Sequence, residues 1–118
     1  MESSQPLPFG HISPKTLAQR LPAEGDTLQL IDVREPEEVA IAHLPQFQVL
    51  SLSQFPNWSG NIHSHLEADK ETIVMCHHGM RSAQMCQWLC QQGFTNVKNL
   101  TGGIDAYAVT VDSSLPRY

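Results

Sequence analysis

The sequence alternates short apolar runs with stretches whose apolar residues recur at helical spacing. The clearest apolar runs occupy positions 28–33 and 72–75, and residues 48–52 and 96–100 are further candidate strands. Apolar runs of this length between turn residues are typical of strands buried in a parallel sheet. Because strands that alternate with helices build βαβ units, we expect an α/β fold with a mostly parallel central sheet of about five strands flanked by helices.

Helical stretches are expected between these runs. Ser13 and Pro14 form a helix-entry signal, with Ser as the N-cap and Pro at the first helical position. The helix that they begin is expected to end by Pro22, because proline lacks the N–H group that a helix interior needs. The expected helices cover residues 14–21, 82–92 and 104–109, and a further helix is expected to begin near residue 35 and to end by Pro45.

A chain of 118 residues is the size of one domain with its own core. Residues 1–10 hold two prolines and a glycine without periodicity, and they predict a flexible N-terminal segment. The domain itself is expected to cover residues 11–118. Within it, residues 53–69 are the least regular part and predict a loop with one or two helical turns.

Charge and hydropathy exclude two classes of partner. The formal net charge is −5 and the seven Lys and Arg residues are scattered, so we expect no direct nucleic-acid ligand. No apolar run approaches the roughly 20 residues of a membrane-spanning helix, so we expect no membrane partner. The N-terminus lacks a secretory pattern, and the three cysteines lack the spacing of a disulfide framework. The expected compartment is therefore cytoplasmic.

Cys76 stands between an expected buried strand and an expected helix. In open α/β sheets, ligands bind beyond the carboxyl ends of the strands. Gly79 in the connecting loop is free to adopt positive φ, so successive backbone N–H groups can point inward at an anion. A helix N-terminus and the nearby Arg81 favour the thiolate form of a cysteine, which is the reactive form. We therefore predict that Cys76 is a nucleophile.

The spacing around Cys76 separates two kinds of chemistry. Four residues lie between Cys76 and Arg81. Cysteine-dependent phosphatases place one residue more between the nucleophile and the phosphate-binding Arg, because their loop wraps a tetrahedral phosphate. The shorter loop argues against phosphatase or arsenate reductase activity. Asp32 and Arg34, at the end of another strand, are expected to face the same crevice and to pair with each other or brace the loop.

Three segments resemble the rhodanese family in their order and spacing. They are LQLIDVREPEEVAIAHLP around the strand at 28–33, IVMCHHGMRSAQ at the loop, and GFTNVKNLTGGIDAY near the C-terminus. The tail VDSSLPRY also resembles that of bacterial single-domain members, so the resemblance runs from about residue 11 to residue 118. It implies the three-layer rhodanese-like fold and a sulfurtransferase.

The resemblance also implies a mechanism and a set of site residues. Catalytic Cys76 would take sulfane sulfur from thiosulfate or a persulfide donor, small or protein-bound, and pass it to a thiol acceptor or to cyanide. No metal and no cofactor are implied. Asp32 and His43 would be structural near the site. The implied substrate-binding residues are His77, His78, Gly79, Met80, Arg81, Ser82 and Arg34.

Two departures from the family pattern concern the donor and the packing. Many rhodaneses follow the catalytic Cys with Arg, whereas this chain has His77, which is neutral at higher pH. Thiosulfate is therefore expected to be a poor donor. The family's Gly-Ala in the second motif is here Gln46-Phe47, and its closing-helix Trp is Tyr107, and both changes concern packing.

Simpler interpretations apply to several other residues. Cys86 and Cys90 lie on the apolar face of an expected helix and predict core packing. The adjacent Cys76, His77 and His78 lack the usual spacing of zinc ligands, so no metal site is predicted.

The acidic residues at the start of the second helix, Glu35, Glu37 and Glu38, are interpreted as a solvated helix start. The alternative to an enzyme is a rhodanese-fold sulfur carrier or interaction module with little intrinsic turnover.

Overall fold

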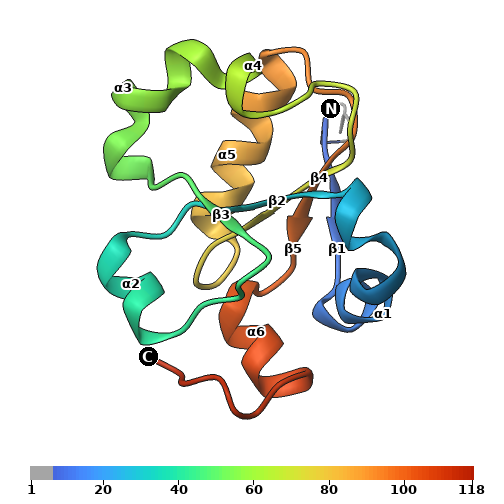
Figure 1. The fold of residues 1–118 in the computed structure, drawn as a ribbon, viewed down its shortest axis with the longest axis vertical. Helices are drawn as coiled ribbons and strands as arrows, with labels where there is room; N and C mark the ends of the chain where they lie inside the picture. The colour runs from blue at the N-terminus through green and yellow to red at the C-terminus, as the bar shows by residue number, and fades with distance from the viewer. Residues whose placement is uncertain (1–6) are drawn as a thin grey trace, which may run out of the picture.

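A computed structural model describes residues 7–118, so residues 1–6 of the expected flexible segment lie outside the described part of the chain. The described residues form one five-stranded sheet in which all neighbouring strands are parallel. The spatial order is β1-β5-β4-β2-β3 (Figure 1). The strands are β1 (Gly10–Ile12), β2 (Gln29–Asp32), β3 (Gln48–Val49), β4 (Thr72–Met75) and β5 (Val97–Leu100).

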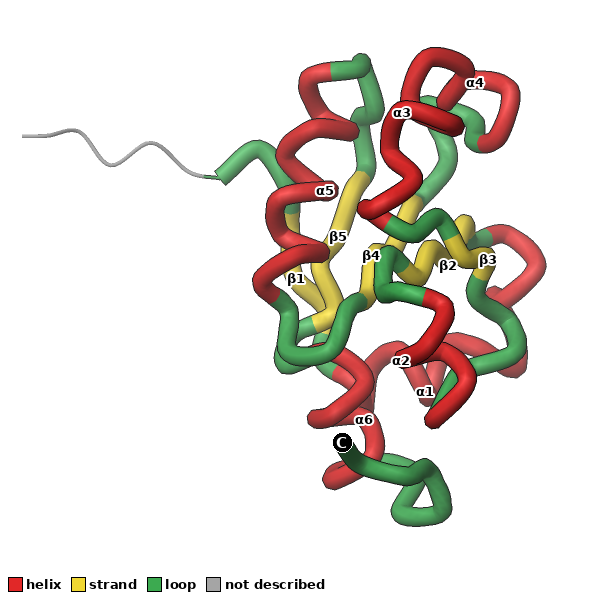
Figure 2. The backbone as a smooth tube through the Cα atoms, turned by 90° about the vertical axis from the view of Figure 1, so that its left-hand side faces the viewer, coloured by secondary structure: helices red, strands yellow, loops and turns green. Residues whose placement is uncertain are grey.

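Helices cover both faces of this sheet and give three layers (Figures 1 and 2). Apolar side chains of α1 and α6 pack on one face, and those of α3, α4 and α5 pack on the other. The expected α/β fold with a parallel sheet is thereby confirmed. The helices are α1 (Pro14–Glu24), α2 (Pro36–Ile41), α3 (Phe55–Trp58), α4 (Ile62–His65), α5 (Met80–Gln91) and α6 (Gly103–Thr110).

The alternation of side chains along β4 divides the core into two parts. Ile73 and Met75 belong to the cluster with α1 and α6, whereas Val74 and the following Cys76 belong to the cluster with α5. Successive side chains of a strand point to opposite faces of the sheet. The side chain of Cys76 therefore leaves the end of β4 on the α5 side.

The sheet register brings three strand ends together. Asp32 pairs with Met75 in the ladder between β2 and β4, and β5 ends at Leu100 on the other side of β4. Because the strands are parallel, the residues that follow them leave the sheet at the same edge. Arg34 and Cys76 both lie at this edge, which is where a ligand is expected to bind.

The N-terminal part of the fold differs from the sequence expectation. The strand β1 has three residues with no alternating apolar pattern, and it was not among the expected strands. It begins at Gly10, and Phe9 before it is buried, so both residues belong to the folded domain. The prediction that Pro22 ends the first helix is wrong, since α1 continues to Glu24. Pro22 lies near the end of the helix, so its missing N–H group removes only one late helical hydrogen bond.

The irregular segment between β3 and β4 is more helical than expected. Residues 52–65 form two short 3-10 helices together with α3 and α4. Trp58, Ile62 and Leu66 from this segment are buried against the α5 face of the sheet. These widely spaced apolar residues fix the segment, whereas its prolines and glycines hid the helical pattern.

Candidate active site

Cys76 begins the loop that connects β4 to α5. The residue is only 1% exposed, so its thiol is recessed below the surface. Gly79 has a φ of +104°, the left-handed conformation that was predicted for it, and it directly precedes α5. The helix starts at Met80, two residues earlier than expected, so Arg81 and Ser82 lie in its first turn.

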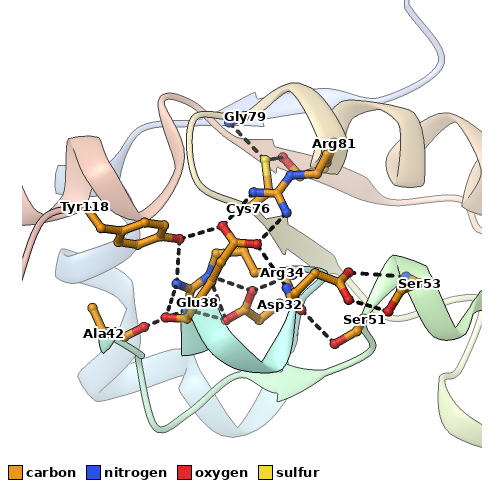
Figure 3. A network of polar contacts seen from close by, with 12 residues as sticks. Asp32, Arg34, Glu38, Ala42, Ser51, Ser53, Cys76, Gly79, Arg81 and Tyr118 are labelled. Carbon is orange, nitrogen blue, oxygen red and sulfur yellow. Dashed lines mark hydrogen bonds and ion pairs between the residues drawn. The ribbon is translucent and has the colours of Figure 1, made fainter. Parts of the chain in front are cut away.

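Two hydrogen-bond donors converge on the sulfur of Cys76 (Figure 3). The backbone N–H of Gly79 donates to Sγ at 3.1 Å, and the hydroxyl oxygen of Ser82 lies 3.3 Å from Sγ. The first N–H groups of α5 have no partner within the helix and add positive potential at this point. The loop thus surrounds the sulfur with groups that stabilise negative charge.

The carbonyl groups of the same loop are turned away from the sulfur. The backbone N–H of Ile104 donates to the carbonyl of Cys76 at 2.9 Å, and that of Asp105 donates to the carbonyl of His77 at 3.1 Å. This contact needs glycine at position 103, because a Cβ there would lie 2.4 Å from both carbonyl oxygens. The start of α6 therefore fixes the orientation in which the loop presents its N–H groups to the sulfur.

Asn99 supports the loop from β5, and the sequence interpretation missed it. Its amide Nδ2 donates to the carbonyl of Gly79 at 2.9 Å, and its Oδ1 lies 2.5 Å from the hydroxyl of Ser82. The single hydroxyl hydrogen of Ser82 can go either to Asn99 or to Sγ of Cys76. The strand β5 also carries Lys98, so a polar side chain at position 99 gave no distinct signal in the sequence.

Arg81 is held by a carboxylate. Its Nη1 donates to Oε1 of Glu38 at 2.7 Å and its Nη2 donates to Oε2 at 2.9 Å (Figure 3). These bonds hold the pKa of Glu38 at about 2. The interpretation of Glu38 as a solvated residue is therefore wrong, because its carboxylate is paired with Arg81. The pairing was missed because Arg81 lies 43 residues further along the chain. The predicted attraction of anions by Arg81 stays a prediction.

Arg34 is fully buried and makes an ion pair with Asp32, at 2.8 Å between Nη2 and Oδ2. Its remaining N–H groups donate to the carbonyls of Glu38 and Ala42 and to the hydroxyl of Tyr118. All five N–H groups of the guanidinium are thereby used. This arrangement gives Arg34 a structural role and leaves it no free donor for a substrate.

Within the loop, the ring of His77 stacks on Tyr118 and contacts the tilted ring of His78. The His77 ring lies between Tyr118 and His78, with 3.9 Å between ring centroids on each side. Burial, with His78 nearby, lowers the pKa of His77, so the ring favours its neutral form. His78 lies 3.9 Å from the carboxylate of Asp105. Tyr118 carries no local sequence signal for this contact.

The other predicted residues lie around this centre. Met80 is 79% exposed beside the loop, and His43 is exposed without a side-chain hydrogen bond to any other described residue. The structural role of His43 stays a prediction. Cys86 is buried in the core and Cys90 packs against it, which confirms their packing role.

Two findings concern classes of ligand. Within residues 7–118, no group of three or more His, Cys, Asp or Glu side chains is arranged to hold a metal ion. In the same part of the chain, each helix is too short or too polar to cross a lipid bilayer.

Comparison with known proteins gives relatives that carry a domain of this kind. The chloroplastic rhodanese-like/PpiC domain-containing protein 12 of Arabidopsis thaliana is 53% identical over 93 residues. The match covers 79% of this chain but 31% of that protein, so the chain spans less than a third of this relative's length. Because this relative is chloroplastic, the cytoplasm stays a prediction for the present chain.

Two further matches cover most of this chain and most of the protein compared with it. A protein named sulfurtransferase from Allochromatium vinosum is 37% identical over 97 residues, which are 82% of this chain and 86% of that protein. The crystal structure of a rhodanese-related protein from Thermoplasma volcanium has a TM-score of 0.71 at 25% identity, over 92% of this chain and 96% of that one. The family model of the rhodanese-like domain matches residues 13–110. With the parallel sheet and the cysteine loop at its edge, these matches establish that the chain belongs to the rhodanese-like domain family.

Proposed function

We propose that this protein is a sulfurtransferase that carries sulfane sulfur as a persulfide on Cys76. The observation that carries the proposal is the convergence of the Gly79 N–H group and the Ser82 hydroxyl on Sγ. Donors aimed at the place where negative charge develops stabilise an anionic sulfur without reorganisation. The relative named sulfurtransferase supports the same chemistry.

In the first half-reaction the Cys76 thiolate attacks the outer sulfur of the donor. A new S–S bond forms to Sγ, and the bond between the donor's two sulfur atoms breaks. Its electron pair leaves with the departing group, which is sulfite from thiosulfate or a thiolate from an organic persulfide. Cys76 then carries an anionic terminal sulfur, and the Ser82 hydroxyl can turn its hydrogen from Asn99 to this charge.

In the second half-reaction an acceptor attacks the terminal sulfur. A thiolate becomes a persulfide, cyanide becomes thiocyanate, and the Cys76 thiolate is restored. Two half-reactions that share one covalent intermediate predict ping-pong kinetics. The residues of this chain supply all the groups that these steps need, so no cofactor takes part in the proposal.

The bidentate ion pair between Arg81 and Glu38 favours sulfur transfer over phosphate transfer at this site. A phosphate-binding loop needs its Arg free to bind two phosphate oxygens. Here the same two N–H positions already donate to the carboxylate of Glu38. A carrier or interaction module with slow turnover would use the same persulfide, and steady-state kinetics distinguish it from an enzyme.

Intact mass spectrometry tests the proposal. After incubation with thiosulfate or with a persulfide donor, the protein should gain one sulfur atom per chain. Cys76→Ser should abolish this adduct, whereas Cys90→Ser, at a partly exposed thiol in α5, should keep it. Absence of an adduct with every donor, or an adduct that persists in Cys76→Ser, would overturn the proposal.

A further inference from the structure

Both arginines close to Cys76 are paired with carboxylates of the protein itself. Arg34 is buried and makes an ion pair with Asp32, and Arg81 makes a bidentate ion pair with the carboxylate of Glu38. The ring of His77 is held towards its neutral form by burial. The site therefore offers backbone and hydroxyl donors to an anion, but it offers no unpaired arginine at the loop.

The carboxylate of Glu38 accepts four hydrogen bonds from three groups. Two come from Arg81, one comes from the backbone N–H of Glu35 at 3.1 Å, and one comes from the hydroxyl of Tyr118 at 2.9 Å. Together these bonds keep the carboxylate ionised and fixed beside the loop. Arg81 is in turn fixed in the first turn of α5, close enough to Cys76 for the two charges to interact.

We propose that Glu38 is a specificity-determining residue that cancels the charge of Arg81 and thereby selects sulfur donors with a single negative charge over dianionic donors. This inference rests on the proposed function. It concerns the donor class, because a small organic persulfide or thiosulfonate carries one negative charge where thiosulfate carries two.

The physical reason is the field that a donor meets at the loop. A free Arg81 would attract a second negative charge several ångströms away by an energy that corresponds to about tenfold or more in rate at an effective dielectric near 20. The carboxylate of Glu38 lies within 3 Å of that guanidinium and removes most of this attraction. The dianion thus gains little from its extra charge while it keeps its larger cost of desolvation.

A pair of donors that differ mainly in charge tests this inference. Methanethiosulfonate has a methyl group where thiosulfate has a charged oxygen, and both donate their terminal sulfur. With methanethiosulfonate, the S–S bond forms to Cys76, the donor's S–S bond breaks, and methanesulfinate leaves with the electron pair. The measured quantity is the ratio of second-order rate constants for persulfide formation, thiosulfate over methanethiosulfonate, by rapid quench and mass spectrometry.

Glu38→Gln should raise this ratio about tenfold, because the charge of Arg81 is then uncompensated. Glu38→Asp keeps the charge and should leave the ratio within about twofold of that of the parent protein. Glu37→Gln is the matched control, since Glu37 is exposed on the same helix and has the same charge. An unchanged ratio in Glu38→Gln, or an equal rise in Glu37→Gln, would overturn the inference.

Salt dependence in the unsubstituted protein gives a test that needs no variant. The chain has a net charge of −5, so with Arg81 neutralised the dianion is repelled, and added salt should raise the ratio. A ratio that falls with salt would mean that Arg81 attracts the dianion, which contradicts the inference. If neither of these donors nor an organic persulfide forms a persulfide on Cys76, the proposed function fails. If only the organic persulfide does, or if both donors react and the ratios disagree with expectation, only the role of Glu38 fails.

Discussion

The hydroxyl of Tyr118 donates a hydrogen bond to Oε2 of Glu38 at 2.9 Å and accepts one from Nη1 of Arg34 at 2.9 Å. The tail after α6 thereby reaches α2, which supplies the carboxylate that holds Arg81 (Figure 3). Leu115 packs against the core and Arg117 pairs with Asp105, so the tail has further anchors. The tail is consequently part of the support of the active-site loop.

Tyr118→Phe should separate the polar role of this residue from its packing role. The variant loses both hydroxyl hydrogen bonds but keeps the ring that stacks on His77. We expect the free energy of unfolding to fall by about 1 kcal/mol, because the hydroxyl is near the surface. Persulfide formation should slow by about threefold, and Tyr118→Ala should slow it further.

The matched control for this prediction is Tyr107→Phe. Tyr107 is buried in α6, and its hydroxyl makes no hydrogen bond to another residue in the described range. Urea unfolding and rapid-quench kinetics give the two readouts. If Tyr118→Phe matches the parent protein in both, the hydrogen bonds of the tail do not support the loop.

Gly103→Ala should disturb the loop more than a comparable glycine substitution elsewhere. Its Cβ would lie 2.4 Å from the carbonyl oxygens of Cys76 and His77, so the loop or α6 must move. We expect a loss of more than about 2 kcal/mol in stability and the loss of most persulfide formation.

Gly93→Ala provides the control for backbone strain. Gly93 also has positive φ, but an added Cβ there would meet no atom within 4 Å. This variant should lose about 1 kcal/mol and keep its activity. Equal effects of the two substitutions on activity would mean that the contact between α6 and the loop is not needed.

The expected strands and most helices could be read from the sequence because their signals are local. The run at 72–75 consists of β-branched and apolar residues and becomes β4, which is covered on both faces. The strand β1 lacked such a signal, because it is held by pairing with β5 near the other end of the chain. The extension of α1 past Pro22 was likewise missed, because a proline was treated as a stop whatever its place in the helix.

The residues of the candidate site likewise fall into those that a local sequence signal predicts and those that only the fold brings to the loop. The nucleophile and the left-handed glycine follow from the succession of strand, loop and helix between β4 and α5. Glu38, Asn99 and Tyr118 reach the loop from other elements, and neither helix periodicity nor strand alternation reports on such pairs. Glu38 in particular has the sequence pattern of a solvated helix start, and only the fold brings Arg81 to it.

Ser82→Ala should slow persulfide formation. The variant removes one of the two donors that converge on Sγ of Cys76, while the Gly79 N–H remains. Removal of a comparable donor in an oxyanion hole costs a hundredfold or more, and with a second donor retained on sulfur we expect about tenfold. Stability should fall by about 1 kcal/mol, because Oδ1 of Asn99 loses its partner.

Ser64→Ala is a matched control for Ser82→Ala, since Ser64 is exposed in α4, which lies before β4, and the loop follows β4. Both variants can be compared in one rapid-quench series. Undiminished persulfide formation in Ser82→Ala would show that the hydroxyl does not stabilise the sulfur anion.

Glu71→Gln should make the stability of the protein less dependent on acid pH. Glu71 accepts hydrogen bonds from Arg20 at 2.6 and 2.8 Å and from Lys98 at 2.6 Å, and chiefly the bonds from Arg20 lower its pKa to about 2. A carboxyl whose pKa is lower in the folded state stabilises the fold above its ordinary value near 4.5. That contribution is lost as the pH falls from about 4.5 to about 2.

Urea unfolding at a series of pH values checks this expectation. At neutral pH, Glu71→Gln should be less stable than the parent protein, and the difference should shrink towards zero as the pH approaches 2. Glu67→Gln is the control, because that side chain is 68% exposed and its pair with Lys70 adds little. Glu71 precedes β4, at the opposite end of the strand from Cys76, so persulfide formation at neutral pH should be unchanged. A stability difference that stays constant with pH would mean that the ion pairs of Glu71 do not stabilise the fold.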